Sequence, residues 1–456
     1  MKLGARLNQA SVPPPAMRAS EAPGAISPAL TPEVYYDLKA TLHGRIVDRL
    51  DLATLSQLTR EQFAQEITAI LGQMVSESSL PLNRREREQM VLELIDEILG
   101  LGPLEALMRD TAVSDILVNT FNTIYVERAG RLELTGMRFR DNDHLQLTIN
   151  RIVSRVGRRV DESSPMVDAR LADGSRVNAI IPPLAVDGPI LSIRRFGGAP
   201  LRVEDLIRIG SMTLPMRDFI DACVKSRLNI LVSGGTGTGK TTMLNALSSF
   251  IPTHERVVTI EDAAELQLQQ PHVVRLETRP PNVEGRGEVL TRDLVRNSLR
   301  MRPDRIIVGE IRSVEVIDML QAMNTGHEGS MATVHANSPR DALTRMMAMI
   351  GMSGLNVTEA VVSQMIARAL DLVIQLQRSQ DGKRRIVSVS EITGTEGNMI
   401  QMQDIFTFQQ RGVDDQGAVV GSFVTTGLRP RCVERLERAG FAIPAELFMP
   451  VSEHRR

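Results

Sequence analysis

The stretch GGTGTGKTT, residues 234–242, limits the fold more than any other part of the chain. It matches the pattern G-x-x-x-x-G-K-[ST] in full. This pattern forms a loop whose backbone N–H groups surround phosphate oxygens, and the loop works only between a buried strand and the start of a helix. The apolar run LNILVSG precedes it and TTMLNALSSFI follows it, so the context predicts a strand, a phosphate loop and a helix.

Each residue type in this loop has a physical reason. Glycines let successive N–H groups turn toward the phosphates, and Lys240 neutralises the β and γ oxygens of a nucleotide. The hydroxyl of Thr241 is a ligand for Mg²⁺. We therefore expect ATP and Mg²⁺ as cofactors. The residues expected to contact the nucleotide are Gly234, Gly235, Thr236, Gly237, Thr238, Gly239, Lys240, Thr241 and Thr242.

Apolar runs alternate with helical stretches after the phosphate loop and just before it. The runs are LNILVSG, RVVTIED, HVVRLE, RIIVGEI and SMATVHA. Such alternation predicts an α/β domain with a largely parallel sheet covered on both faces. The expected organisation is a disordered tail at 1–30, a helical bundle at 31–110, an α+β module at 111–196, a linker at 197–204 and the α/β domain at 205–456.

The helical bundle is expected from RREREQMVLELIDEILGLGPL, where apolar residues recur at helical spacing. Gly100, Gly102 and Pro103 are expected to end that helix. Residues 35–50 and 59–71 have similar patterns, which suggests a small three-helix bundle. The tail is rich in Pro, Ala and Ser and has no apolar period.

Composition gives no indication of a nucleic-acid partner, a tetracysteine zinc site or a membrane span. Lys+Arg 53 against Asp+Glu 55 gives a net charge of −2, so nothing in the total charge demands a nucleic-acid partner. The chain has two cysteines, Cys223 and Cys432, too far apart in sequence for a CxxC pair and too few for a tetracysteine zinc site. No window approaches the ~20 apolar residues of a membrane span. We expect a soluble, cytoplasmic protein.

Hydrolysis of a bound nucleotide needs a carboxylate that orients water. The run RIIVGEIR places Glu310 at the end of a buried strand, whereas Gly309 stands where a generic P-loop enzyme has an acidic metal ligand. Another carboxylate is then needed for the metal, and VVTIEDAAE offers Glu261 and Asp262. The alternative for each of these residues is an ordinary surface carboxylate.

Two histidines lie close together in TGHEGSMATVHANSP, at His327 and His335. Their spacing with Glu328 is not that of a metal-binding helix. A histidine at a polar strand end can contact a γ-phosphate, and the alternative is a structural histidine.

Four stretches together resemble a known family. GGTGTGKTT, TIEDAAE, TRDLVRNSLRMRPDRIIVGEIR and TGHEGSMATVHANSP resemble the Walker A motif, Asp box, atypical Walker B motif and His box of the type II/IV secretion ATPase superfamily. The sequences RMRPDRIIVGE and TGHEGS are most similar to those of its CpaF/TadA branch, the motors of tight-adherence (Tad) pili. In that family a glycine at the position of Gly309 is normal.

The resemblance implies a RecA-like P-loop C-terminal domain, preceded by an α+β domain of PAS-like shape and the N-terminal helical bundle. It implies a hexameric ring with nucleotide between the PAS-like and RecA-like domains. Glu310 would then polarise water, and His335 would sense the γ-phosphate, with His327 in the same box. Glu261 and Asp262 would stand in the metal shell. The expected metal ligands are Thr241, Glu261 and Glu310.

Arginines that act on the nucleotide of a neighbouring subunit are a further implication of the resemblance. The candidates are Arg194 and Arg195, before the linker, and Arg296 and Arg300, before the Walker B motif. The alternative for each is a structural salt bridge.

The function that the resemblance implies is a cytoplasmic ATPase motor, peripheral at the inner membrane, where it binds pilus platform proteins. It would drive Tad pilus assembly, with retraction left open, and without direct nucleic-acid contact. The alternatives are a type IV secretion traffic ATPase, a RecA-like DNA translocase, and a regulator that binds ATP without transport. A translocase is expected to have aromatic stacking residues, and the aromatic content is 3% with no Trp. The lack of a tetracysteine module disfavours the type II secretion branch.

Overall fold

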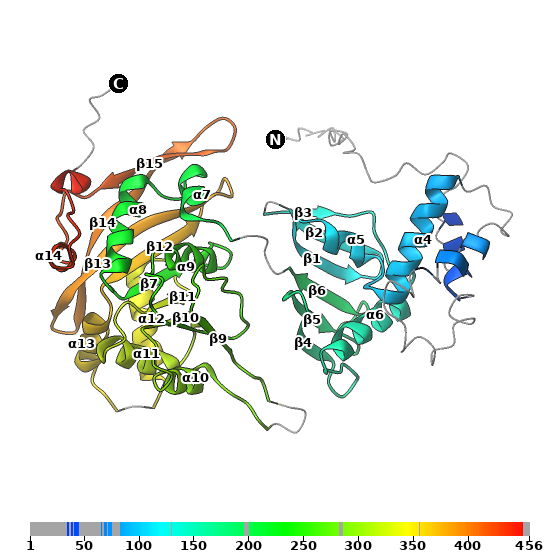
Figure 1. The fold of residues 1–456 in the computed structure, drawn as a ribbon, viewed down its shortest axis with the longest axis horizontal. Coiled ribbons are helices and arrows are strands. Elements are labelled where there is room, and N and C mark those ends of the chain that lie inside the picture. The colour runs from blue at the N-terminus through cyan, green and yellow to red at the C-terminus, as the bar shows by residue number, and fades with distance from the viewer. Residues whose placement is uncertain are drawn as a thin grey trace, which may run out of the picture. The chain divides into compact units, whose positions relative to one another are not determined.

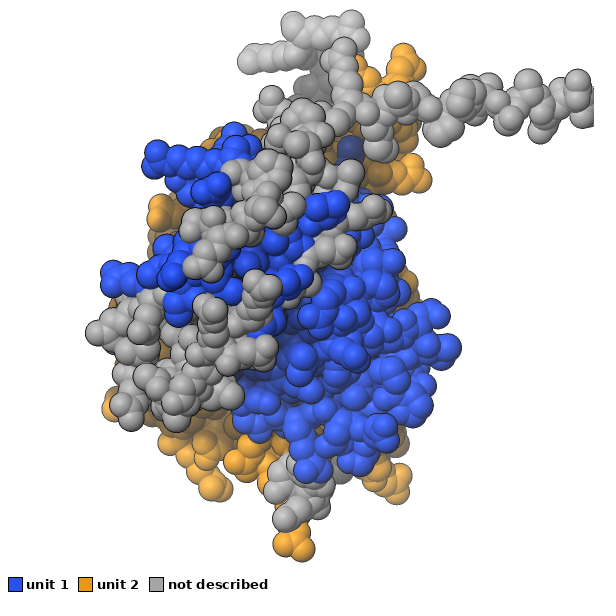
Figure 2. Space-filling model, turned by 90° about the vertical axis from the view of Figure 1, so that its right-hand side faces the viewer, with its two compact units in different colours: residues 1–195 blue, residues 196–456 orange. Residues whose placement is uncertain are grey.

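A computed structural model describes residues 34–35, 38–39, 41–44, 65, 68–70, 72–74, 83–128, 130–195, 200–281, 286–354 and 356–449. It divides into two compact units, Met1–Arg195 and Phe196–Arg456, which Figure 2 colours separately. The expected tail, much of the first two expected helices and the first residues of the expected linker lie outside the described residues.

The first unit begins its well-described part with α4 (Arg84–Leu99), the helix predicted from the apolar period. The Asn83 side chain accepts a hydrogen bond from the Glu86 backbone N–H at 2.9 Å, and the Glu86 carboxylate accepts one from the Asn83 N–H at 2.9 Å. This reciprocal cap fixes where the helix starts. Met90 and Leu94, on its apolar face, are fully buried.

An antiparallel sheet follows, in the order β3-β2-β1-β6-β5-β4 within the described residues. Its apolar face packs on α6, whose Leu145, Ile149 and Ile152 are buried with Ile116 and Ile193 of the sheet. The first unit therefore contains an α+β module. Its elements are α5 (Leu104–Arg109), β1 (Val113–Thr120), β2 (Thr123–Arg128), β3 (Arg131–Leu134), α6 (Asn142–Arg155), β4 (Met166–Arg170), β5 (Arg176–Ile180) and β6 (Ile190–Arg194).

The second unit is an α/β domain built on a mixed sheet (Figure 1). Its elements are α7 (Val203–Arg208), α8 (Leu214–Lys225), β7 (Ile230–Gly234), α9 (Lys240–Ser248), β8 (Val257–Glu261), β9 (Val273–Glu277), α10 (Thr291–Ser298), β10 (Arg305–Ile311), α11 (Glu315–Asn324), β11 (Met331–Val334), α12 (Pro339–Gly351), α13 (Glu359–Ala369), β12 (Leu372–Arg378), β13 (Arg384–Glu396), β14 (Met399–Val413), β15 (Val419–Thr425), α14 (Val433–Arg438) and a 3₁₀ turn (Ala445–Phe448).

The strand order in this sheet is β15-β14-β13-β12-β7-β11-β10-β8-β9. Strands β12 through β9 in that order pair in parallel. The alternating apolar runs predicted these strands except β12. The other strands, β13, β14 and β15, pair antiparallel. The α/β class is confirmed. The antiparallel strands β13, β14 and β15 were not predicted, because these long strands mix apolar and polar residues without a clear apolar run.

Helices cover both faces of this sheet, as Figure 1 shows. Because side chains alternate along a strand, Ile230 and Val232 of β7 are buried among α8 and α9, whereas Leu231 is buried among α11, α12 and α13. No described helix is both long enough and apolar enough to cross a bilayer.

The amino-terminal edge of the sheet is held by the side chain of Asn229, just before β7. Its amide nitrogen donates to the carbonyls of Met323 at 3.3 Å and Ala369 at 2.7 Å. Its oxygen accepts from the N–H groups of Gly329 at 2.8 Å and Ser330 at 3.1 Å. One buried amide thus joins the ends of α11 and α13 to the segment before β11.

A buried ion pair lies at the same edge. Arg305, at the start of β10, is 0% exposed and pairs with Glu255, whose side chain is 3% exposed. The guanidinium also donates to the carbonyl of Gly329 at 3.3 Å. A Cβ on Gly329 would lie 2.6 Å from Arg305 Nη1. Packing at this edge therefore requires a glycine at position 329, the second glycine of TGHEGS.

We expect Glu255→Gln to destabilise the protein by about 3–5 kcal/mol, because it leaves Arg305 buried without a carboxylate. The measurement is the urea midpoint of the purified full chain. Glu434→Gln is the matched control, because the Glu434 side chain is 76% exposed beside Arg438, and it should change stability by less than about 0.5 kcal/mol. Equal midpoints for both variants would contradict the structural role of the buried pair.

Candidate functional site

The carboxyl ends of the central strands bring the motif residues to one edge of the sheet. β7 ends at Gly234 and leads into the phosphate loop, and β11 ends just before His335. β10 ends with Glu310 and the residue after it, and β8 ends at Glu261. Because these strands are parallel neighbours in the order β7-β11-β10-β8, the loop, the histidine and the two glutamates share this edge. This edge is where open α/β sheets bind ligands.

The phosphate loop has the conformation that its glycines allow. Gly237 and Gly239 have φ of 70° and 95°, in the left-handed region. The Lys240 ammonium donates to the carbonyl oxygens of Gly234 and Gly235, both at 3.0 Å. The lysine thus lies across its own loop, bound to neutral acceptors that a phosphate can replace.

A second cation lies against the loop. Arg384, at the start of β13, donates from Nε to the carbonyl of Gly237 at 2.8 Å. Burial lowers the pKa of Lys240, and Glu310 partly opposes that shift. Sequence reasoning missed Arg384, because it lies outside every motif and reaches the loop only through the pairing of β13 with β12 and of β12 with β7.

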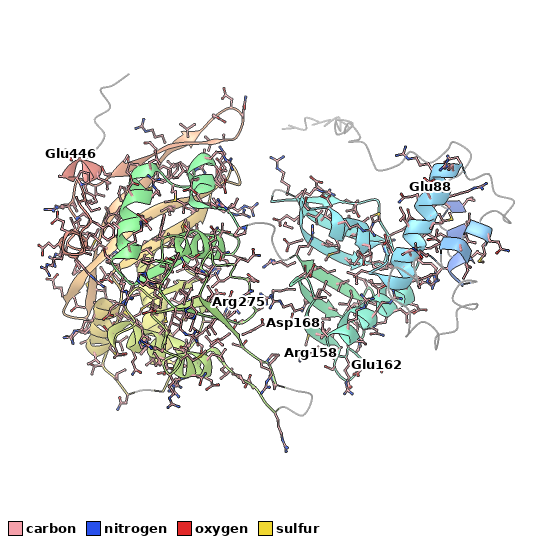
Figure 3. The ribbon with its side chains drawn as sticks, in the orientation of Figure 1. Glu88, Arg158, Glu162, Asp168, Arg275 and Glu446 are labelled. Carbon is pink, nitrogen blue, oxygen red and sulfur yellow. The ribbon has the colours of Figure 1, made fainter. Side chains whose placement is uncertain are left out.

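Glu261 is buried, with 5% exposure. Its Oε1 accepts from the N–H groups of Glu265 and Leu266, both at 2.9 Å. Its Oε2 is buried without a hydrogen-bond partner among the described residues. Burial raises the pKa of Glu261 to about 6, against the lowering effect of these backbone bonds and of Arg275 on β9 (Figure 3).

Packing against Glu261 explains why position 309 is a glycine, which the sequence alone did not reveal. A Cβ at this position would lie 2.8 Å from Cγ of Glu261. The Glu261 side chain from the neighbouring strand fills the space that a side chain at 309 would need. A carboxylate from β8 thus lies beside the position of β10 where a generic P-loop enzyme has its own acidic residue.

Glu310 and Asp262 are joined by an arginine. Arg312 donates from Nε to Glu310 Oε2 at 2.8 Å and from Nη1 to Asp262 Oδ2 at 2.8 Å. Asp262 also accepts from the Thr291 hydroxyl at 3.2 Å. Arg312 was not predicted as a site residue, although it stands in the quoted run RIIVGEIR.

The residues at this edge fit a magnesium nucleotide. The unpartnered Oε2 of Glu261 and the hydroxyl of Thr241, in the first turn of α9, are the oxygen ligands that Mg²⁺ prefers. The phosphate loop supplies backbone N–H groups at a helix N-terminus. Thr236, Thr238 and Thr242 lie in the same loop and first helical turn, as expected. Among the described residues no group of three or more His, Cys, Asp or Glu forms a metal cluster.

The two histidines lie at opposite ends of β11. His335 follows the strand and lies at the carboxyl edge, with the phosphate loop. His327 precedes the strand, and its Nδ1 is buried without a partner among the described residues. Within one chain the strand between them therefore places the two histidines at different edges of the sheet, and the role expected of His327 stays a prediction.

The candidate arginines of the first unit bond within that unit. Arg194 pairs with Asp115 at 3.0 Å and its side chain is 63% exposed. Arg195 donates to the carbonyl oxygens of Asp110 and Val113, the latter at 3.1 Å. Arg195 thus ties the start of β1 to the end of β6, whereas Arg194 keeps an exposed side chain.

The candidate arginines of the second unit lie on and after α10. Arg296 donates to Asp318 of α11 at 2.8 Å, and Arg292 donates to the other oxygen of the same carboxylate at 2.8 Å. Arg300 is exposed just after the helix. Arg296 therefore has a structural partner in its own chain.

Comparison with known proteins gives consistent matches. A sequence profile described as "Type II/IV secretion system protein" matches residues 97–419. The chain is 37% identical over 330 residues to a putative conjugal transfer protein of Mycobacterium tuberculosis, covering 71% of this chain and 93% of that protein. It is 26% identical over 328 residues to the type IV secretion system protein VirB11 of Bartonella quintana, covering 63% and 91%. The crystal structure of the VirB11 ATPase from the Brucella suis type IV secretion system in complex with sulphate is 25% identical, with a TM-score of 0.35 over 65% of this chain and 97% of that one.

We expect Glu261→Gln to stabilise the nucleotide-free protein at pH 8 and to have little effect at pH 4. The folded-state pKa of about 6 lies above the ordinary 4.5. The free energy of unfolding therefore falls as pH rises from 4.5 to 6, and above pH 6 it is about 2 kcal/mol lower than at pH 4. The uncharged amide of the Glu261→Gln variant does not ionise, so this variant avoids the decrease. Melting curves in EDTA at several pH values measure it. The exposed Glu288→Gln is the control, and a Glu261→Gln difference that is independent of pH would contradict the assignment.

Proposed function

Because the chain belongs to the type II/IV secretion system protein family, we propose that it is an ATP-hydrolysing motor of a secretion or pilus-assembly machine. The observation that carries the proposal is the convergence of the Lys240 loop, Glu310 and Glu261 at one sheet edge. Nucleotide binding and water activation need these three groups together.

In the proposed reaction, Lys240 leaves the carbonyl oxygens of its own loop and binds the β and γ oxygens of ATP. The N–H groups of the loop and of α9 hold the phosphates, and the loop keeps its shape through Gly237 and Gly239. Glu310 accepts a proton from the attacking water or orients it. Thr241 and Glu261 would hold Mg²⁺, which supplies charge neutralisation on the phosphate oxygens.

We place His335 near the γ-phosphate, because it shares the edge with the phosphate loop. We further propose a hexamer in which a PAS-like domain of one subunit and the RecA-like domain enclose the nucleotide. Of the candidate arginines, we favour the exposed Arg300 as the one that acts on the nucleotide of a neighbouring subunit. Arg194, Arg195 and Arg296 all bond within their own chain, to Asp115, to backbone carbonyls and to Asp318 respectively.

We propose two alternatives for the machine that this ATPase drives, a Tad pilus and a type IV secretion system. The motif wording RMRPDRIIVGE and TGHEGS favours the CpaF/TadA branch, in which the protein drives Tad pilus assembly through inner-membrane platform proteins without touching nucleic acid. The similarity to a putative conjugal transfer protein and to VirB11 favours a type IV secretion role. In both forms the protein is cytoplasmic and peripheral at the inner membrane, held there by its partners.

We expect Glu310→Gln to bind ATP yet lower kcat by about 10²- to 10⁴-fold, because the group that orients water is lost. Lys240→Ala should remove both tight binding and hydrolysis, because the phosphate cation is lost. Purified protein, a phosphate-release assay and a binding titration with a fluorescent ATP analogue measure both effects. Wild-type turnover in Glu310→Gln would remove this residue from the chemistry, and a wild-type protein without hydrolysis would overturn the proposed function.

The same Glu310→Gln substitution at the native locus separates the two machines. Loss of surface filaments with normal DNA or protein export supports the pilus motor. Loss of export with normal filaments supports the secretion motor. Normal filaments and normal export would contradict both forms.

We expect Arg384→Gln to weaken ADP and ATP binding by about 5- to 30-fold with kcat changed little, since one charge-assisted contact near the phosphates contributes about 1–2 kcal/mol. Lys383→Gln is the matched control, because Lys383 is the exposed neighbour and has no hydrogen bond to the loop in the described structure. Binding titrations measure the change. Equal affinities for the two variants would show that Arg384 contacts the carbonyl of Gly237 but does not contribute to nucleotide binding.

A further inference from the structure

Arg312 bridges two carboxylates that the motifs place in different roles. Its Nε and Nη2 donate to the same oxygen, Oε2 of Glu310, at 2.8 and 2.5 Å. Its Nη1 donates to Oδ2 of Asp262 at 2.8 Å. The guanidinium therefore uses all three of its nitrogens at this edge.

The backbone around Arg312 is fixed from one side. The buried carboxylate of Glu315, at the start of α11, accepts from the N–H of Arg312 at 2.6 Å and from the N–H of Ser313 at 2.8 Å. These bonds hold the turn between β10 and α11. The Arg312 side chain thus starts from a fixed backbone, although 57% of it is exposed.

Asp262 is fixed from the other side by a different helix. Its Oδ1 accepts from the Thr291 hydroxyl at 3.2 Å, at the start of α10. With Oδ2 bound to Arg312, each oxygen of Asp262 already has a protein donor. Glu261, its neighbour, differs, because one of its oxygens is buried with no partner among the described residues.

The two carboxylate oxygens of Glu310 differ in their hydrogen bonds to Arg312. Both contacts from Arg312 reach Oε2, and none reaches Oε1. A carboxylate held at one oxygen keeps a fixed plane, so its second oxygen points in one direction and can serve a water molecule. A carboxylate without this contact rotates about its last bond and loses that direction.

We propose that Arg312 is a positioning residue for the hydrolysis proposed above, holding Glu310 by Oε2 so that Oε1 orients water, and that Asp262 anchors Arg312 and is not a metal ligand. This assignment rests on the proposed ATPase function. In this assignment Glu261 is the metal ligand and Asp262 is the partner of Arg312.

Steady-state hydrolysis by the purified full chain tests the role of Arg312. Arg312→Gln should lower kcat by about 10- to 100-fold with KM changed by less than about threefold, because misplacing a catalytic group has effects of this size. Arg312→Lys keeps one charged contact and should recover part of the loss. Arg438→Gln, an exposed arginine paired with Glu434 on α14, is the control and should keep wild-type values. Melting temperatures confirm that each variant is folded.

A double-mutant cycle tests the role of Asp262. Asp262→Asn should lower kcat less than Arg312→Gln, and the double variant should be no slower than Arg312→Gln alone, because both changes break one connected contact. Binding of Mn²⁺ to the protein with ADP, followed by electron paramagnetic resonance of the free ion, should be unchanged in Asp262→Asn and weakened about tenfold or more in Glu261→Gln.

Three results would overturn the assignment. Weaker Mn²⁺ binding in Asp262→Asn would return this residue to the metal shell. A raised KM with normal kcat in Arg312→Gln would make the arginine a binding residue, and wild-type kinetics would remove it from the site. Absence of hydrolysis in the wild-type protein is a separate result, which overturns the proposed function and the present inference with it.

Discussion

The parallel register of the central strands is the constraint on which the candidate site depends. Val334 pairs with Ser233 across β11 and β7, and Val308 pairs with Ile260 across β10 and β8. These pairings bring the phosphate loop, the histidine and the two glutamates to a common edge. A slip of one residue would turn the side chains of a strand to the other face. The buried bonds at the amino edge, from Asn229 and the Arg305 pair, hold the same strands at their other ends.

Close packing decides which carboxylate occupies the edge. Gly309 has no side chain, and Glu261 from the neighbouring strand takes the space above it. Burial then raises the pKa of Glu261 to about 6 and leaves one of its oxygens without a partner among the described residues. Asp262, one residue later, is more exposed and bonded to Arg312. Two adjacent acidic residues thus acquire different chemistry from their surroundings.

Charge at the edge is balanced by residues from separate elements. Lys240 comes from the start of α9, Arg312 from the turn after β10 and Arg384 from β13. Each of these cations bonds to the protein itself: the lysine and Arg384 to loop carbonyls, and Arg312 to carboxylates. The phosphate oxygens of a bound nucleotide would compete with these loop carbonyls for Lys240 and Arg384.

The sequence by itself determined the α/β class, the phosphate loop, the helix that follows it and the strand ends that carry Glu261, Glu310 and His335, because these depend on local apolar runs and glycine conformations. Only the tertiary structure separated His327 from His335, gave the reason for Gly309 and brought Arg384 to the loop. These features depend on which strands are neighbours and in what register. A linear pattern does not contain that information, since pairing between distant strands is decided by the packing of the whole sheet.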